Sequence, residues 1–393
     1  MKKILAFNDY YIPATDVGGP VTSINNASKA LKKEFEFYIE AYNHNFSDNI
    51  PFENINTNEW YRVGDANVMY HADGELDFNY KNTEKFIKDV NPDIMWFSGL
   101  LMPNKLYNAI KIGEKLNIPV VISPRGEASP DRMAIKGYKK FPYALLITLL
   151  GIYKKKNVYF HATSDDEIVG LIKFFKINPS RITKVANIGV VPVKRKMTYE
   201  KKSGEIRIMF ISRIHKVKNL HMAIQIVNQL KGKVTFDIYG PIESKEYWAQ
   251  CENLIKSSPD NVKIRYCGKV SPDKVDQVYS NYDCFLFPTV NENYGHVIAE
   301  ALANGCPVVL SRGTTPWDDL HNIAGYVCSL DCIDEFVDSL NKIIEFDDSR
   351  FRELVNNTYR YYCGKTRDDN AIDGHIEMFK KIIEQRNLYG GDI

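Results

Sequence analysis

Short runs of β-branched and aromatic residues alternate with helix-length segments along the whole chain of 393 residues. In the first half the predicted strands are KILAFN, EFYIEAY, DIMWFSG, PVVISPRG, VYFHATS and KVANIGVV, and the predicted helices lie at about residues 20–33, 82–90, 103–116, 129–155 and 165–175. In the second half the predicted strands are IRIMFISR, VTFDIYG, VKIRYCG, CFLFP, PVVLS and GYVCSL. This alternation is typical of α/β units built on parallel sheets.

A polar stretch, KRKMTYEKKSGE, interrupts the pattern near residue 195 and has the composition of a linker. The chain is also too long for one ordinary hydrophobic core. We therefore predict an α/β protein of two Rossmann-like domains that face a central cleft. The predicted boundaries are 1–195 and 196–370, followed by a C-terminal helix over 371–393 that packs back toward the first domain. Ligands of such sheets bind beyond the carboxyl ends of the strands.

Composition narrows the class of protein. The chain is 44% hydrophobic and 25% charged, as expected of a folded, soluble protein, and its 51 basic residues nearly balance 49 acidic ones. This balance gives no support to nucleic-acid binding, which needs a concentrated basic surface. All seven cysteines lie at or after Cys251 and none forms a C-x-x-C pair. We expect reduced, mostly buried thiols in a cytoplasmic protein.

The segment NENYGHVIAEALANG, residues 291–305, follows a predicted buried strand. Gly295 lies where the loop turns into a helix, so the backbone can approach a ligand closely and the helix N-terminus favours an anion such as phosphate. Glu292 precedes that turn, and Glu300 on the helix could accept hydrogen bonds from ribose hydroxyls. The alternative is a solvated loop carboxylate and a surface helix carboxylate.

Two further segments carry candidate ligand-binding residues. In ISRIHKVKN, residues 211–219, Arg213 and Lys218 would neutralise a diphosphate, unless the segment is only a solvated basic loop. In VGGPVTSINNASKAL, Gly18 and Gly19 lie between the first strand and the first helix, where paired glycines allow a close approach to a polar ligand.

Taken together, these motifs resemble the retaining GT-B glycosyltransferases of family 4. The resemblance rests on the Glu292-x7-Glu300 pair, EALANGCPVV after it, SR-x4-KN at 212–219 and the paired glycines. In the first domain NPDIMWFSG, ISPRGEASP, HATSDDE and NIGVVPV are similar, in order and spacing, to blocks of bacterial members that build surface polysaccharides. The resemblance extends over essentially the whole chain.

The resemblance implies an acceptor-binding first domain and a donor-binding second domain that share a nucleotide-diphosphate sugar of UDP or GDP type. Its catalytic residues would be Glu292 on the sugar hydroxyls, with Arg213 and Lys218 on the diphosphate. Glu300 would hold the ribose, and backbone N–H groups of residues 293–296 would contact sugar or phosphate. The donor-binding set implied in this way is Gly18, Gly19, Arg125, Asn293, Tyr294, Gly295, His296 and Glu300. Transfer would retain the anomeric configuration, with no cofactor and no metal, and the chain has no D-x-D motif.

Arg125 marks a departure from the family pattern. Many relatives carry a T-x-H-like block where this chain reads SPRG. Its role is open between donor phosphate, acceptor recognition and a structural turn. We expect His161 to pack in the core, and Trp317 and Asp318 either to shape the donor end of the site or to stabilise a turn.

The segment KGYKKFPYALLITLLGIYKKK, residues 136–156, contains an apolar run of 13 residues with lysines on both sides. The run is too short to span a bilayer. The segment predicts either peripheral contact with the inner face of a membrane or a buried helix with solvated ends. The expected acceptor is accordingly a glycan or a lipid-linked glycan. A nucleotide-sugar-binding protein without transfer activity and an NDP-sugar epimerase on the same fold are the alternatives.

Overall fold

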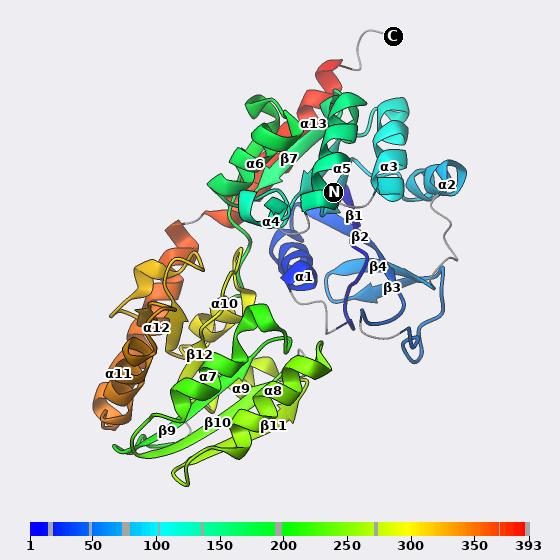
Figure 1. The fold of residues 1–393 in the computed structure, drawn as a ribbon. Helices are drawn as coiled ribbons and strands as arrows, with labels where there is room; N and C mark the ends of the chain where they lie inside the picture. The colour runs from blue at the N-terminus through cyan, green and yellow to red at the C-terminus, as the bar shows by residue number, and fades with distance from the viewer. Residues whose placement is uncertain are drawn as a thin grey trace. The chain divides into compact units, whose positions relative to one another are not determined.

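The computed structural model describes residues 1–14, 19–46, 49–72, 79–100, 103–134, 137–192, 199–270, 274–368 and 370–389. The chain forms two compact units (Figure 1). Unit 1 comprises Met1–Ile188 and Asp369–Ile393, and unit 2 comprises Gly189–Asp368. The boundaries lie within seven residues of the predicted ones. Each unit is a mainly parallel α/β structure, so the predicted fold class is confirmed.

Unit 1 is built on a sheet in the order β3-β4-β2-β1-β5-β6-β7-β8. Its strands are β1 (Lys2–Phe7), β2 (Phe35–Tyr42), β3 (Trp60–Val63), β4 (Ala66–His71), β5 (Ile94–Ser98), β6 (Val120–Ser123), β7 (Val158–Ala162) and β8 (Ile182–Lys184). Among these strands β3 alone runs antiparallel to its neighbour, and the others pair in parallel. The inner strands are almost fully buried, as expected of a parallel sheet covered on both faces.

Helices cover both faces of the unit 1 sheet. They are α1 (Gly19–Leu31), α2 (Tyr80–Val90), α3 (Pro103–Leu116), α4 (Pro130–Ala134), α5 (Gly137–Leu149), α6 (Asp165–Phe175) and α13 (Ala371–Tyr389), with 3₁₀ turns η1 (Ile152–Lys154) and η2 (Pro179–Arg181). Alternate residues of β1 face opposite sides, so Leu5 joins the core under α2, α3, α5 and α6 while Ile4 joins the core under α1 and α13. Phe379 of α13 packs edge-on against Trp96 with ring centroids 5.2 Å apart. The C-terminal helix therefore completes the first unit.

Unit 2 has a sheet in the order β11-β10-β9-β12-β13-β14, with every pairing between its described strands parallel. The strands are β9 (Glu205–Ile211), β10 (Lys233–Tyr239), β11 (Val262–Gly268), β12 (Cys284–Phe287), β13 (Val308–Ser311) and β14 (Gly325–Cys328). The helices are α7 (Leu220–Val227), α8 (Lys245–Lys256), α9 (Val275–Ser280), α10 (His296–Ala303), α11 (Ile333–Ile344) and α12 (Asp348–Asp368), with 3₁₀ turns η3 (Lys216–Lys218) and η4 (Asp318–Leu320). A continuous apolar core joins this sheet to α7, α10 and α11.

The structure corrects two sequence predictions in unit 1 and adds one hairpin. The strand predicted for KVANIGVV, 184–191, is wrong: β8 ends at Lys184, and the chain then leaves the sheet after Val185 N–H donates to the Ala162 carbonyl. The helix predicted over 129–155 is divided into α4, α5 and η1, with Gly151 in the left-handed region at φ 63°. The β3–β4 hairpin was not predicted, although its turn at Gly64, φ 59°, lies in a V-G-D sequence that signals one.

Candidate functional site

Three loops of unit 2 meet beyond the carboxyl ends of β9, β12 and β13 and are joined by hydrogen bonds. Val290 N–H donates to the Val217 carbonyl at 2.9 Å, and Glu292 N–H donates to the Thr314 carbonyl at 2.8 Å. Ser311, the last residue of β13, donates from its hydroxyl to the Thr289 carbonyl at 2.5 Å. Since all three strands are parallel neighbours, their ends bring together segments about 100 residues apart in sequence. This is the edge at which open α/β sheets bind ligands.

Lys218 and Glu292 form an ion pair at the centre of these loops. The Lys218 ammonium Nζ donates to Glu292 Oε1, and each side chain keeps 14% of its surface exposed. The ammonium also lies 5.8 Å from the centroid of the Phe287 ring at the end of β12. Two of the three predicted catalytic residues are thus in direct contact. A lysine with one carboxylate partner keeps hydrogen-bond donors for an anionic ligand, because an ammonium has three.

Gly295 is the N-cap residue directly before α10 and lies in the left-handed region, at φ 74° and ψ 65°. A Cβ at this position would lie 2.8 Å from Ile298 Cδ1, so a side chain here meets both backbone strain and a clash. Trp317, 1% exposed, fixes the preceding residue by donating from its indole N–H to the Tyr294 carbonyl at 2.6 Å. The rings of Tyr294 and His296 lie 4.9 Å apart beside this turn. The loop–helix junction is therefore held in place by the core.

Asp318 stabilises a turn, which is one of the two roles considered for it from the sequence. Its carboxylate oxygen Oδ2 accepts a hydrogen bond from Gly313 N–H at 2.9 Å and so stabilises the turn after β13.

Glu300 lies half-buried on α10, on the side that faces α9. The Tyr279 hydroxyl donates to Glu300 Oε2 at 3.4 Å and to the Val297 carbonyl at 2.9 Å. Burial, followed by the charge of Asp276, raises the pKa of Glu300 to about 7. A carboxyl group held at such a pKa is destabilised in its charged form, and hydroxyl donors from a ligand would relieve that cost. Raised carboxyl pKa values are typical of functional sites.

Arg213 follows the end of β9 and is already paired. Its NH1 donates to Glu243 Oε2 at 2.9 Å, and both side chains are about one third exposed, at 38% and 33%. A guanidinium has five N–H donors, so this ion pair leaves others for an anion. Glu243 did not enter the predicted site. Its position a few residues after the end of β10 was the available signal, because that loop lies at the same sheet edge.

The candidate residues of unit 1 divide into three cases. Gly18 lies outside the described residues, and Gly19 is the first residue of α1. Arg125 lies beyond the carboxyl end of β6 in the left-handed region, at φ 54°. Its NH1 donates to Asn187 Oδ1, and its guanidinium lies 5.4 Å from the centroid of the Trp96 ring.

The Arg125 side chain is only partly satisfied. Its Nε and NH2 atoms are buried and have no hydrogen-bond partner among the described residues. Burial lowers the pKa of Arg125 to about 10, although the charge of Glu167 acts in the opposite direction. Buried guanidinium donors without partners are costly, and an anionic or polar ligand would satisfy them. His161, by contrast, is fully buried and bonded to Ser123 and the Val185 carbonyl, so its predicted packing role is confirmed.

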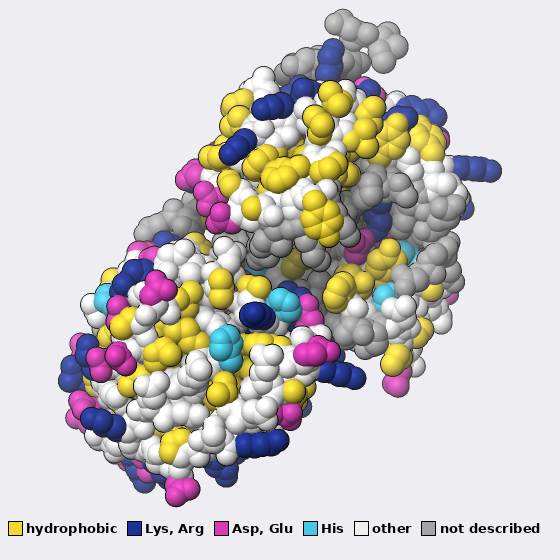
Figure 2. Space-filling model, in the orientation of Figure 1, with side chains coloured by type: hydrophobic (Ala, Val, Ile, Leu, Met, Phe, Trp, Pro, Cys, Tyr) yellow, Lys and Arg dark blue, Asp and Glu magenta, His cyan; other side chains and the backbone are white. Residues whose placement is uncertain are grey.

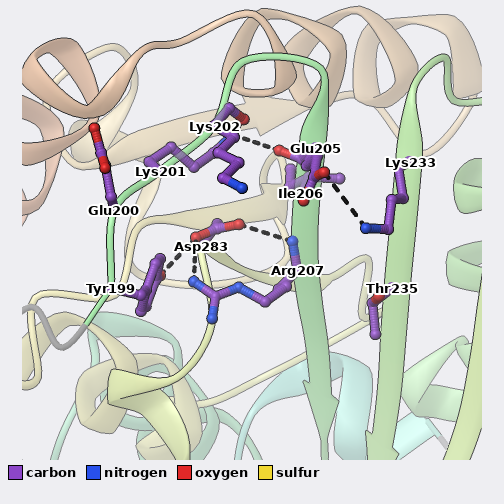
Figure 3. Close-up of a pocket in the computed structure, with 10 residues that line it drawn as sticks. All are labelled: Tyr199, Glu200, Lys201, Lys202, Glu205, Ile206, Arg207, Lys233, Thr235 and Asp283. Atoms are coloured by element: carbon purple, nitrogen blue, oxygen red, sulfur yellow. Dashed lines mark hydrogen bonds and ion pairs between the residues drawn. The ribbon is translucent and has the colours of Figure 1, made fainter.

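A pocket of about 250 Å³ lies at the opposite edge of the unit 2 sheet (Figure 3). It is lined by the amino ends of β9 and β10 and by the chain segment at Tyr199. Figure 3 shows Tyr199 and Arg207 converging on Asp283, whose Oδ1 accepts from them at 2.5 and 3.2 Å. These contacts fasten the end of the linker to unit 2. None of the predicted site residues lines this pocket.

The burial of the cysteines can be compared with the prediction of mostly buried thiols. All seven cysteines are free, and Cys251, Cys284, Cys306 and Cys328 are buried. Within the described part of the chain, no three His, Cys, Asp or Glu side chains are grouped to hold a metal ion.

The fold is that of the GT-B glycosyltransferases. A solved structure of Anabaena Alr3699/HepE, in complex with UDP and glucose, superposes over 97% of this chain and 100% of that protein with a TM-score of 0.68. At 15% identity this likeness shows the fold.

Sequence comparison matches most of unit 2 to a known domain family. Residues 194–361, nearly all of unit 2, match the family of glycosyl transferases group 1. The comparisons thus show a match of residues 194–361 to the glycosyl transferases group 1 family and a GT-B fold for the chain.

Two curated relatives align with part of the chain. Human alpha-1,3/1,6-mannosyltransferase ALG2 is 22% identical over 157 residues, which are 36% of this chain and 38% of the relative. The capsular polysaccharide biosynthesis glycosyltransferase CapM of Staphylococcus aureus is 25% identical over 187 residues, 46% of each chain. The matched segments thus span less than half the length of these relatives.

Proposed function

We propose that this protein is a retaining glycosyltransferase that moves a sugar from a nucleotide-diphosphate sugar to a glycan or lipid-linked acceptor. The observation that carries the proposal is the half-buried Lys218–Glu292 pair, held on three hydrogen-bonded loops at the carboxyl edge of the matched domain. The mannosyl and capsular polysaccharide transferases among its relatives, and the UDP of the Anabaena structure, support a nucleotide-sugar donor.

In the proposed donor complex, Lys218 and Arg213 bind the diphosphate and stabilise the charge that develops as it leaves. Glu292 accepts hydrogen bonds from the sugar hydroxyls. The backbone of Asn293, Tyr294, Gly295 and His296 contacts sugar or phosphate, and Glu300 accepts from the ribose hydroxyls. The donor-binding residues proposed in unit 1 are Gly18, Gly19 and Arg125.

The proposed reaction balances without a cofactor or a metal. The bond between the anomeric carbon and the distal phosphate oxygen breaks, and the acceptor oxygen bonds to the anomeric carbon on the same face. The acceptor proton passes to the departing phosphate oxygen, so the products are the glycosylated acceptor and the nucleoside diphosphate. The protein supplies positioning and electrostatic stabilisation.

Glu292→Gln tests the proposal, because the amide keeps the shape of the side chain but lacks its charge. Wild type and variant are incubated with UDP-, GDP- and CMP-sugars and a panel of alkyl glycosides, and nucleotide release is measured with and without acceptor. We expect acceptor-dependent release that Glu292→Gln lowers at least about 100-fold. Glu353→Gln, which alters an exposed carboxylate on α12, is the matched control.

The other outcomes are informative. Full transfer by Glu292→Gln contradicts the proposed site. Tight donor binding without release in any combination indicates a binding protein, and conversion of the donor sugar without acceptor indicates an epimerase. The anomeric configuration of the product, read by NMR, tests retention.

A further inference from the structure

Helix α5 of unit 1 and the residue after it expose a stripe of large apolar side chains, here called the α5 apolar stripe. Its members are Tyr138, Phe141, Leu145, Leu146, Leu149 and Leu150. Their exposed fractions run from 44% for Phe141 to 74% for Tyr138 and Leu149. Residues 138, 141, 145 and 149 recur at helical spacing, so they lie along one face. The opposite face, with Ala144 and Ile147, is buried in the core.

The buried face agrees with the interpretation of this segment as a core helix, and the exposed face is the surface at which peripheral contact would occur. The core uses one face, and the apolar stripe on the other exceeds what core packing requires. Figure 2 shows hydrophobic side chains gathered where Figure 1 places α5 and α6. Val169 and Ile172 of α6 add exposed fractions of 50% and 38%. Contiguous apolar surface of this kind marks a site of contact with a partner or a membrane.

Charge distinguishes between these occupants. Residues 132–164 contain no Asp or Glu but seven basic residues: Arg132, Lys136, Lys139, Lys140, Lys154, Lys155 and Lys156. The chain as a whole is balanced, with 51 basic and 49 acidic residues. The nearest acidic residues along the chain are Asp131 before this segment and Asp165 and Asp166 in the first turn of α6.

The lysines lie where a surface-bound helix needs them. Lys154 and Lys156 are exposed and come shortly after the end of the apolar stripe at Leu150, and Lys155 is partly exposed while paired with Glu114. A symmetric contact between two copies of this stripe would bring like charges together, which disfavours it. An anionic lipid surface complements both features, because the apolar stripe inserts at the headgroup boundary and the lysines meet the lipid phosphates.

We propose that the α5 apolar stripe and its flanking lysines bind the surface of a membrane that contains anionic lipids. No described helix is both long and apolar enough to cross a bilayer. In the proposed complex α5 lies in the plane of the interface. The inference deepens the proposed function only in that it favours the lipid-linked class of acceptor, and membrane binding itself is testable without any transfer activity.

Vesicle flotation tests this proposal with the full chain. The two vesicle types are an equal mixture of phosphatidylglycerol and phosphatidylcholine, and phosphatidylcholine alone, at 0.1 M and 0.5 M salt. We expect binding to the anionic vesicles that is at least about 10-fold weaker on phosphatidylcholine and weaker at high salt. Leu145→Glu/Leu149→Glu should lower binding to the anionic vesicles at least about 10-fold, because it places two charges in the stripe.

Matched controls separate the outcomes. Ile323→Glu/Ile372→Glu changes two exposed isoleucines, 48% and 45% exposed, outside the stripe and should bind like wild type. Circular dichroism checks that both double variants are folded. Wild type that does not bind anionic vesicles, or equal binding by Leu145→Glu/Leu149→Glu, overturns the proposal. A dimer in light scattering that this variant alone dissociates, without vesicle binding, identifies a second copy as the occupant and also overturns it.

Acceptor-dependent nucleotide release with soluble alkyl glycosides is measured on the same variants. Leu145→Glu/Leu149→Glu should release nucleotide as wild type does with these acceptors. Loss of vesicle binding with release intact thus supports the membrane surface, whereas absent release from wild type bears on the proposed function alone.

Discussion

Two lysine–carboxylate pairs near carboxyl edges of the two sheets look alike in composition and differ in surroundings. In unit 1 Lys105 lies between Asp9 Oδ1 at 2.7 Å and Glu40 Oε2 at 2.9 Å, and Glu40 also bonds to His71. The Glu40 and His71 side chains are fully buried, and that of Lys105 is 8% exposed. In unit 2 Lys218 has Glu292 as its carboxylate partner, with both side chains 14% exposed on loops.

The difference in burial indicates that the Lys105 network stabilises the fold, whereas the Lys218–Glu292 pair is placed to meet a ligand. Burial raises the pKa of Glu40, but the charge of Lys105 and the bond from His71 outweigh it and lower that pKa to about 2. Lys105 is held between two carboxylates and is 8% exposed, so it is not available to a substrate, and removing it leaves buried charge uncompensated. The Lys218–Glu292 pair is reachable, so a diphosphate can compete for the lysine. The same substitution should therefore lower the stability of the protein when made at Lys105 and lower its donor affinity when made at Lys218.

Lys105→Met should cause the largest loss of stability. It removes the cation between two carboxylates, and stranded buried charge of this kind costs about 3–5 kcal/mol. The free energy of unfolding is measured with urea, and hydrogen exchange of peptides covering β2 and α3 localises the loss to unit 1. Donor nucleotide affinity of the protein that remains folded should be within about twofold of wild type.

The control is Lys115→Met, because Lys115 lies on α3 like Lys105 but is exposed. Its partner is Glu84 of α2. The substitution should change stability by less than about 1 kcal/mol. If Lys105→Met is equally mild, the network in unit 1 is not structural and the comparison fails.

Lys218→Met should leave the fold nearly unchanged and weaken donor binding. A charge-assisted bond to phosphate contributes about 1.5–3 kcal/mol, so affinity for UDP or GDP, whichever binds wild type, should fall about 10- to 150-fold. Isothermal titration calorimetry measures the affinity and urea unfolding measures the stability, which should shift by about 1 kcal/mol or less. Unchanged nucleotide affinity would remove Lys218 from the site.

The two pairs also show what the sequence can and cannot predict. Glu292 and Lys218 were identified because each belongs to a compact motif at the end of a predicted strand. Glu40 lies inside the strand FEFYIEAY and Lys105 on a helix 65 residues later, so no local spacing connects them. Their contact follows from the order β2-β1-β5, which pattern alone does not give.

The same limit applies to the elements. Strands such as CFLFP and PVVLS were predicted to within one residue of their observed bounds because a buried parallel strand is a continuous apolar run. KVANIGVV has the same composition, but Asn187 bonds to the side chains of Arg125 and Ser23, so this segment serves tertiary contacts outside the sheet. Composition does not distinguish the two uses, because the competing contacts come from residues at least 60 positions away.

Glu300→Gln should stabilise the protein while impairing donor binding. The pKa of Glu300 in the folded state, about 7, lies above the ordinary value of 4.5, so the native state binds more protons between these pH values. Stability therefore falls as pH rises from 4.5 to 7, and the cost is complete above 7. The neutral amide avoids that cost, so the variant should be more stable by roughly 1–3 kcal/mol at pH 8 and equal at pH 4.5.

Binding distinguishes this carboxylate from a surface one. Wild type should bind a ribonucleoside diphosphate more tightly than its 2′-deoxy form at pH 8, and Glu300→Gln should reduce that preference. Thermal unfolding at the two pH values and calorimetry with both nucleotides provide the measurements. An equal ribose preference in both proteins would show that Glu300 does not contact the ribose.

Arg125→Gly should have the smallest effect on stability and decides between the structural and functional roles of this residue. Glycine adopts φ 54° without the cost of about 1–2 kcal/mol that a side chain carries in the left-handed region. It also removes the buried Nε and NH2, which have no partners among the described residues, while the bond to Asn187 and the contact with Trp96 are lost. These terms oppose one another, so the melting temperature should change by only a few degrees.

Donor affinity should fall about 10-fold if the Arg125 guanidinium binds the donor, because a bond to a charged partner is lost. Arg125→Lys keeps the charge and the strained backbone and should bind more tightly than Arg125→Gly. A large fall in melting temperature with unchanged donor affinity would make Arg125 a structural turn residue, and Arg125 would then belong with Lys105 on the structural side of the comparison.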